Sequence, residues 1–180
     1  LALATDHILV KKQVVELLSA VCVYSHRGHH LAVDAFQYYK ERCGLAFRFG
    51  PLVEEIRNTD VPEYQGSVLA LINCVIVSCD NLLEKIRIRN ELIALGLADV
   101  LKKISSSCDD HAVFVQIRAF EEERVADEDA AREQLGLILE MEPVELFASL
   151  LEKVSSTPHV ACLALMLHHL NQLDPHHPET

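Results

Sequence analysis

The feature of this chain that most constrains its fold is one helical pattern that occurs three times in register. The three copies are QVVELLSAVCVY (13–24), SVLALINCVIVS (67–78) and ACLALMLHHLNQ (161–172). At 100° per residue, each copy places Val, Ile, Leu, Met or Cys on a broad arc and small or polar residues on the opposite arc. This pattern predicts stacked helices that bury one face and share an uncovered groove. In the second copy the apolar arc consists of Val68, Leu69, Ile72, Val75 and Ile76.

The distances between the copies along the chain indicate the kind of array. Ala20 and Cys74 occupy matching positions 54 residues apart, and Cys74 and His168 are 94 residues apart, about twice 47. Armadillo and HEAT repeats run about 40 to 47 residues, so the intervals fit three-helix repeats with a degenerate copy at 111–123. We expect an all-α, armadillo-like right-handed solenoid over residues 1–173, followed by a disordered tail at 174–180. The third helix of each repeat would line the concave side.

Local signals divide the chain into helices, because strand and hairpin signals are nearly absent. Pro51, Pro62 and Pro143 fit helix starts, and Gly96 fits a helix end. The helices are expected at 10–24, 28–41, 46–57, 61–79, 81–95, 97–105, 109–124, 127–140, 143–155 and 158–173.

Composition and the order of residues at the start of the chain indicate the cellular compartment of the protein. No apolar run reaches the roughly 18 residues that a membrane span needs, and the start LALATDHILVKK lacks the order of a signal peptide. We therefore expect a cytoplasmic protein without direct membrane insertion. The chain has no initial Met and enters almost at once on a repeat helix, so we expect a piece of a longer protein. The cysteines in apolar helical stretches, such as Cys22, Cys79 and Cys162, are expected to be reduced.

The charge of the chain bears on its partners. A formal net charge of −11 argues against nucleic acid or an anionic membrane and favours a basic partner. The stretch EEERVADEDAARE (121–133) holds seven acids and two arginines. It is either solvated surface or a docking patch for a Lys/Arg segment. The candidate docking residues are Glu121, Glu122, Glu123, Asp127, Glu128 and Asp129.

Catalytic and metal-binding patterns are not found in the sequence. Adjacent histidines, as at 29–30, 168–169 and 176–177, point about 100° apart on a helix and cannot chelate as residues four apart do. No CxxC, HExxH or Gly-rich phosphate loop occurs. We expect no metal, no cofactor and no catalytic residues, so an enzyme built on Cys and His is the least supported class.

The small or polar arcs supply the candidate residues of the groove. Within them, Asn73 would either bond a bound peptide or satisfy a loop carbonyl inside the solenoid. The basic stretch KIRIR (85–89) is expected to form salt bridges with neighbouring acids such as Glu84 and Glu91. The predicted groove residues are Glu16, Ala20, Ala70, Leu71, Asn73, Cys74, Val77, Gln116 and His168.

Several of these segments also carry a family resemblance, which covers residues 9–173. The runs LALINCVIVSCDNLLEKIRIRNELIALGLADVLKKI, VQIRAFEEERVADED and ELFASLLEKVSSTPHVACLALMLHHL are the main ones. The inner helix followed by RxRNEL, and the F-E-E stretch after a Val-Gln pair, are the most specific. This order resembles the armadillo-repeat regulatory region of diaphanous-related formins and is closest to the inverted formins.

The resemblance implies a regulatory function. In that family the region binds an amphipathic autoregulatory helix near the carboxyl terminus of the same formin, which blocks actin assembly. A Rho-family GTPase, bound mostly through a segment before Leu1, relieves the block, and actin is affected only indirectly. The helix would lie across Ile72–Asn73–Cys74, where the family commonly has Ala in place of Cys74, and its following basic residues would suit the acidic stretch. A cytoplasmic, cytoskeleton-associated location is implied. The alternative is a generic armadillo adaptor that binds an extended peptide of another protein.

Overall fold

The computed structural model describes residues 5–107, 109–140 and 142–172, apart from the side chains of 137–140. Within this part the chain forms helices and no strands, which confirms the all-α prediction. No described helix is both long and apolar enough to cross a bilayer. The predicted tail, 174–180, lies outside the described residues. The helices are α1 (Ile8–Tyr24), α2 (His26–Cys43), α3 (Gly50–Asn58), α4 (Pro62–Val77), α5 (Leu82–Ala94), α6 (Leu97–Ser107), α7 (His111–Glu140), α8 (Pro143–Val154) and α9 (Val160–Asn171).

The ends of the helices follow from capping residues. The Ser25 side chain accepts a hydrogen bond from the N–H of Gly28 at the start of α2, and Asn81 caps α5 in the same way. Pro62 opens α4, where its missing N–H costs nothing. Gly96, at φ +88°, takes the left-handed conformation that separates α5 from α6. Pro62 and Gly96 were among the signals used in the prediction, and most predicted boundaries lie within a few residues of the observed ones.

One predicted break is wrong, because α7 runs without interruption from His111 to Glu140. The prediction ended one helix at 124 and began another at 127. Neither Val125 nor Ala126 is a helix breaker. Arg124 also pairs with Glu128 one turn later, at 2.7 Å, across the predicted break.

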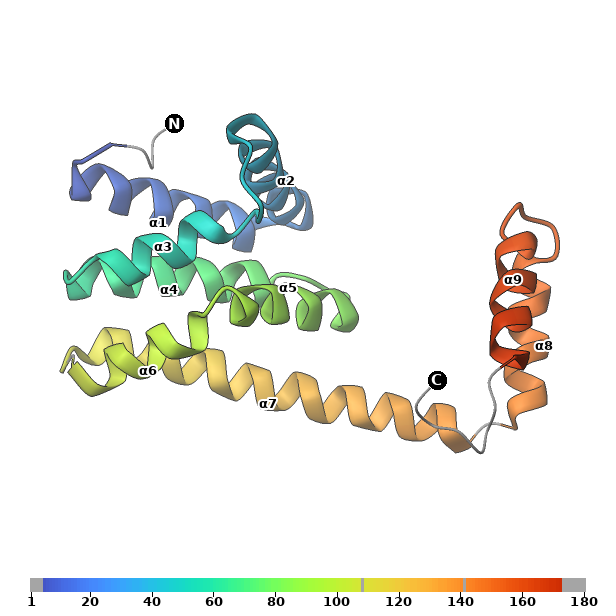
Figure 1. The fold of residues 1–180 in the computed structure, drawn as a ribbon. Coiled ribbons are helices and arrows are strands. Elements are labelled where there is room, and N and C mark those ends of the chain that lie inside the picture. Colours follow the sequence, from blue (N-terminus) through green and yellow to red (C-terminus); the bar gives the residue numbers. More distant parts are fainter. Residues whose placement is uncertain (1–4, 108, 141, 173–180) are drawn as a thin grey trace. The chain divides into compact units, whose positions relative to one another are not determined.

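The chain divides into two compact units, residues 1–132 and 133–180, and the boundary falls within α7. In the first unit, α1, α4 and the beginning of α7 lie side by side in one layer, while α3 and α6 contact each other in a second layer (Figure 1). Helices α2 to α4 form one three-helix repeat and α5 to α7 form the next. Helix α1 takes the place of the third helix of a preceding repeat.

The core of the first unit is centred on α4. This helix contacts α1, α2, α3 and α5, and nine of its sixteen residues are buried. The whole apolar arc predicted for this copy is buried, from Val68 to Ile76, with at most 1% of each side chain exposed. Burial of this kind contributes about 1.5 to 3 kcal/mol for each large aliphatic side chain.

Helices α1 and α2 meet at a corner where their backbones touch. A Cβ atom on Gly28 would lie 2.0 Å from the carbonyl oxygen of Val21. One residue further along α2, His29 is buried and its Nε2 lies 2.8 Å from the carbonyl oxygen of Val75 on α4. Since a carbonyl only accepts, Nε2 carries the hydrogen. The corner therefore fixes α2 to α1 and to α4.

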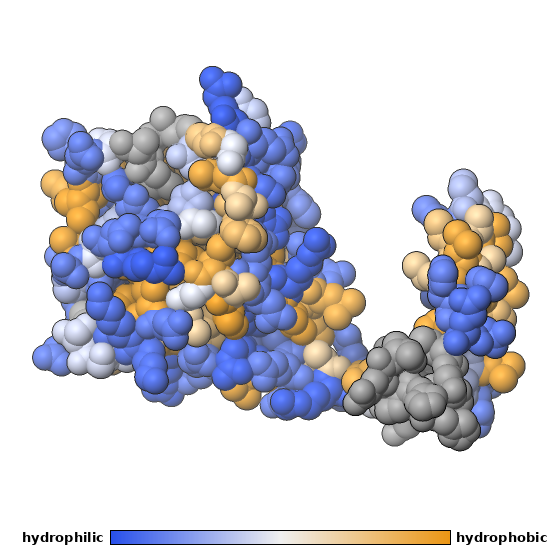
Figure 2. Space-filling view, viewed as in Figure 1, coloured by the Kyte–Doolittle hydropathy of each residue, from blue (hydrophilic) through white to orange (hydrophobic). Residues whose placement is uncertain are grey.

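The second unit contains a hairpin of α8 and α9, which contact each other. No residue of either helix is buried. Figure 2 shows apolar side chains on the surface of this hairpin. The exposed large apolar residues of α8 and α9 are Val144, Leu146, Phe147, Leu150, Leu151, Val160, Leu165, Met166, Leu167 and Leu170.

Candidate functional site

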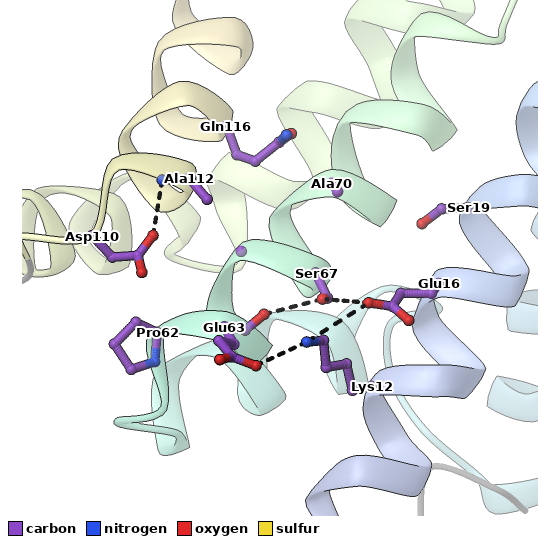
Figure 3. A pocket seen from close by; sticks show the side chains of 11 residues that line it. Lys12, Glu16, Ser19, Pro62, Glu63, Ser67, Ala70, Asp110, Ala112 and Gln116 are labelled. Carbon is purple, nitrogen blue, oxygen red and sulfur yellow. Dashed lines mark hydrogen bonds and ion pairs between the residues drawn. The ribbon is translucent and has the colours of Figure 1, made fainter.

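A groove of about 360 Å³ opens on the first unit between α1, α4 and the start of α7, and we call it the inner groove (Figure 3). Its walls are the third helices of successive repeats, which is the side predicted to be concave. The lining residues are Lys12, Glu16 and Ser19 from α1, Pro62, Glu63, Gly66, Ser67 and Ala70 from α4, and Asp110, Ala112 and Gln116 from the third wall.

One end of the inner groove is charged. Lys12 Nζ lies 2.9 Å from a Glu63 carboxylate oxygen and 4.0 Å from Glu16. The hydrogen bond to Glu63 raises the pKa of Lys12, and partial desolvation opposes it. The hydroxyl of Ser67 lies 3.4 Å from Glu16. These contacts join α1 to α4 and leave acidic groups at this end of the groove (Figure 3).

The middle of the inner groove is made of small residues. Gly66, Ser67 and Ala70 follow one another at helical spacing along α4. Gly66 is buried, and a Cβ atom placed on it would be in van der Waals contact with Val113 of α7, at 3.7 Å. Small side chains let a ligand approach the α4 backbone closely.

Asn73 joins α4 to α7. Its Nδ2 donates to the main-chain oxygen of Gln116 at 2.9 Å and to the side-chain Oε1 of Gln116 at 3.0 Å. Neither interpretation from the sequence described this contact, because its partner belongs to the neighbouring third helix rather than to a loop or a ligand. The structure thus brings Asn73 and Gln116 together at the groove.

Cys74 is half-buried between α4 and α1. Burial raises the pKa of its thiol, and a hydrogen bond with Ser19 acts in the opposite direction. Burial also raises the pKa of Cys22 on α1, to about 11. Both thiols are therefore protonated at neutral pH, which makes them poor nucleophiles.

The other predicted groove residues have different environments. Ala20 is exposed on α1, and Val77 is 46% exposed in the last turn of α4. The prediction for Leu71 is wrong, because this side chain is fully buried. Neighbouring helices cover a wider arc of α4 than the apolar arc that the helical period predicted. His168 lies on α9 in the second unit, where it is exposed, and its place in the groove stays a prediction.

Asp127 is not part of an acidic surface, which corrects the predicted docking patch. Only 6% of the residue is exposed. Its carboxylate lies 2.7 Å from Arg89 Nη2 and 3.8 Å from Lys85 Nζ. The Arg89 guanidinium also lies 5.9 Å from the centre of the Phe120 ring. This buried cluster fastens α7 to α5.

Most of the remaining acids of the stretch are paired within α7. Glu123 and Glu133 are the exceptions, since neither makes an ion pair with the described residues. Intrahelical pairing lowers the local charge, so the solvated-surface interpretation fits these residues better than a docking patch does. The pairs are Arg118–Glu122, Arg124–Glu121, Arg124–Glu128, Arg132–Glu128 and Arg132–Asp129.

The basic stretch 85–89 forms salt bridges, as predicted, but its main partner was missed. Arg87 pairs with Glu84, whereas Lys85 and Arg89 both reach Asp127. A signal was present in the sequence. Buried residues of α7 recur every seven positions, at 113, 120 and 127, so Asp127 continues an apolar face.

No group of three or more His, Cys, Asp or Glu side chains suited to a metal occurs in the part of the chain that the structure describes. The geometry of the inner groove instead suits a macromolecular ligand. It offers small residues in the middle, charged groups at one end and a fixed amide on the third wall.

Comparison with known proteins agrees with this description. The model of the diaphanous FH3 domain matches residues 29–180. Inverted formin-2 of Xenopus laevis is 37% identical over 177 residues, which are 98% of this chain and 16% of the relative. Formin-F of Dictyostelium discoideum is 28% identical over 87% of this chain, which corresponds to 13% of the length of Formin-F. Human formin-like protein 2 is 34% identical over 61% of this chain and 10% of its own length. The chain spans about a sixth of the length of the most similar of these relatives. The chain is thus a helical armadillo-like solenoid with a groove along its third helices. It belongs to the diaphanous FH3 domain family, a regulatory part of formins.

Proposed function

We propose that the inner groove binds an amphipathic helix from the carboxyl-terminal part of the same formin and thereby holds actin assembly inhibited. The observation that carries the proposal is the joining of three successive third helices into one groove with small residues at its centre. Recognition of a helix in a groove needs such close approach, with anchors three, four and seven residues apart. Specific complexes of this kind bury about 1,200 to 2,000 Å² in total.

Ala20, Cys74 and Val77 do not line the inner groove but lie further along the same two helices, α1 and α4. The proposed ligand would extend beyond the groove and place its apolar face over them. Lys12 and Glu63, near the starts of α1 and α4, mark the charged end of the groove. A ligand with an apolar stripe and charged residues at one end complements this gradient. A Rho-family GTPase, bound mainly through a preceding segment of the formin, would release the helix. We place this regulation in the cytoplasm, at the actin cytoskeleton.

An adaptor groove for an extended peptide has less support. Such grooves use asparagines to bond the peptide main chain, but Asn73 uses its amide hydrogens on Gln116. A structure of the complex with an extended ligand would favour the adaptor.

The proposal is tested by titrating the chain with a labelled peptide of the carboxyl-terminal amphipathic helix and following fluorescence anisotropy. Saturable binding at micromolar concentration is expected. Cys74→Asp should weaken it at least about tenfold, because a charge would lie beneath an apolar helix face. Cys43→Asp is the matched control, since Cys43 is exposed at the end of α2. Absence of saturable binding to the unaltered chain would overturn the proposal.

A further inference from the structure

The hydrogen bonds of Asn73 determine which way the Gln116 amide points. A main-chain carbonyl can only accept, so the Asn73 atom 2.9 Å from the Gln116 main-chain oxygen must be its NH₂ group. The same nitrogen lies 3.0 Å from the Gln116 side-chain amide and donates there as well. The Gln116 atom that faces Asn73 must therefore be Oε1.

The other end of the Gln116 amide is consequently Nε2, with two N–H donors. The residue is half-buried, lines the inner groove and extends from α7 toward Ala70 in Figure 3. Nε2 makes no hydrogen bond to the described residues. A donor of fixed orientation therefore remains available in the groove.

We propose that Gln116 is a specificity-determining residue of the inner groove, which donates from Nε2 to an oxygen acceptor of the bound helix, and that Asn73 is the positioning residue that orients it. This inference rests on the proposed function. Carbonyls inside a helix are already paired, so the acceptor is either an Asp, Glu, Asn or Gln side chain on the helix face or a free carbonyl of its last turn.

Two substitutions at position 116 separate donation from packing. Gln116→Met keeps the length of the side chain and removes the donor, and it should weaken binding of the peptide about 2- to 10-fold. Gln116→Glu presents an acceptor where the ligand also presents one, and should cost about tenfold or more. Gln37→Glu, on the exposed side of α2, is the matched control and should leave affinity unchanged.

Asn73→Asp tests the positioning role. A carboxylate cannot donate to Oε1, so the Gln116 amide turns, bonds Asp through Nε2 and offers Oε1 to the ligand. Affinity should fall as it does in Gln116→Glu. In the Gln116→Met background, Asn73→Asp should have no further effect on affinity, whereas a merely structural residue would give additive losses. Urea unfolding of each variant keeps loss of folding apart from loss of binding.

The source of the acceptor is found by replacing the Asp, Glu, Asn and Gln residues of the peptide with Ala one at a time. A peptide variant that binds the unaltered chain more weakly but is indifferent to Gln116→Met identifies a side-chain acceptor. If no peptide variant behaves so while Gln116→Met still weakens binding, the acceptor is a main-chain carbonyl. Unchanged affinity in both Gln116 variants overturns this inference alone, whereas an unaltered chain that fails to bind overturns the proposed function.

Discussion

Helices α4 and α9 arise from the same sequence pattern but differ in burial. Nine residues of α4 are buried, and none of α9 is. The apolar arc of α4 has four helices to pack against. In α9, Leu165 and Met166 are 61% and 63% exposed. The pattern therefore predicts that a segment is helical and which of its sides is apolar, but burial depends on the neighbours that the topology supplies.

The largest expected effect would come from breaking the buried charge cluster of the first unit. Asp127→Ala leaves Arg89 buried without its partner and should lower the free energy of unfolding by about 3 to 5 kcal/mol. All four tyrosines lie between residues 24 and 64 and the chain has no tryptophan, so tyrosine fluorescence in urea reports on the first unit. Asp129→Ala, on the exposed side of α7, should cost about 0.5 kcal/mol or less.

A second comparison truncates one apolar side chain in each matched helix. Ile72→Ala in α4 should cost about 2 to 5 kcal/mol, because the side chain is completely buried and leaves a cavity. Leu165→Ala in α9 should cost about 0.5 kcal/mol or less. Urea unfolding followed by circular dichroism measures both. Equal losses would contradict the difference in burial between the two helices.

The smallest expected effect depends on pH and compares Cys22 with Cys162. Burial raises the pKa of Cys22 from 9.0 to about 11, so above pH 9 the unfolded chain releases a proton that the folded chain keeps. Stability is thus intact below pH 9 and declines toward pH 11, by at most about 2 to 3 kcal/mol. The urea midpoint should fall between pH 8 and pH 10. Cys22→Ala should reduce this fall, whereas Cys162→Ala, at an exposed thiol, should not.

Much of the fold was predictable because local chemistry sets it. The helix starts at Pro62 and Pro143, the helix end at Gly96 and the apolar arc of α4 depend on a few residues each, and the structure agrees with them. The break predicted within α7 was wrong, because the sequence between 124 and 127 holds neither Pro nor Gly to end a helix. Favourable pairs such as Arg124–Glu128 instead support a continuous helix.

The site was less predictable because its contacts are made between distant segments. Asn73 and Gln116 are 43 residues apart, and Arg89 and Asp127 are 38 apart. No period along one helix reports which residue of another helix it meets. For that reason Leu71 was placed in the groove and Asp127 on the surface, although both are buried.

The contact between Gly28 and Val21 has a consequence for mutational scans of this domain. Any side chain at position 28 would displace the end of α1, because it would collide with the Val21 carbonyl. Helix α1 is a wall of the inner groove. A scan scored by ligand binding would therefore mark Gly28 as sensitive, although position 28 does not line the inner groove. A parallel score for the abundance of folded protein would identify Gly28 as a false positive for recognition.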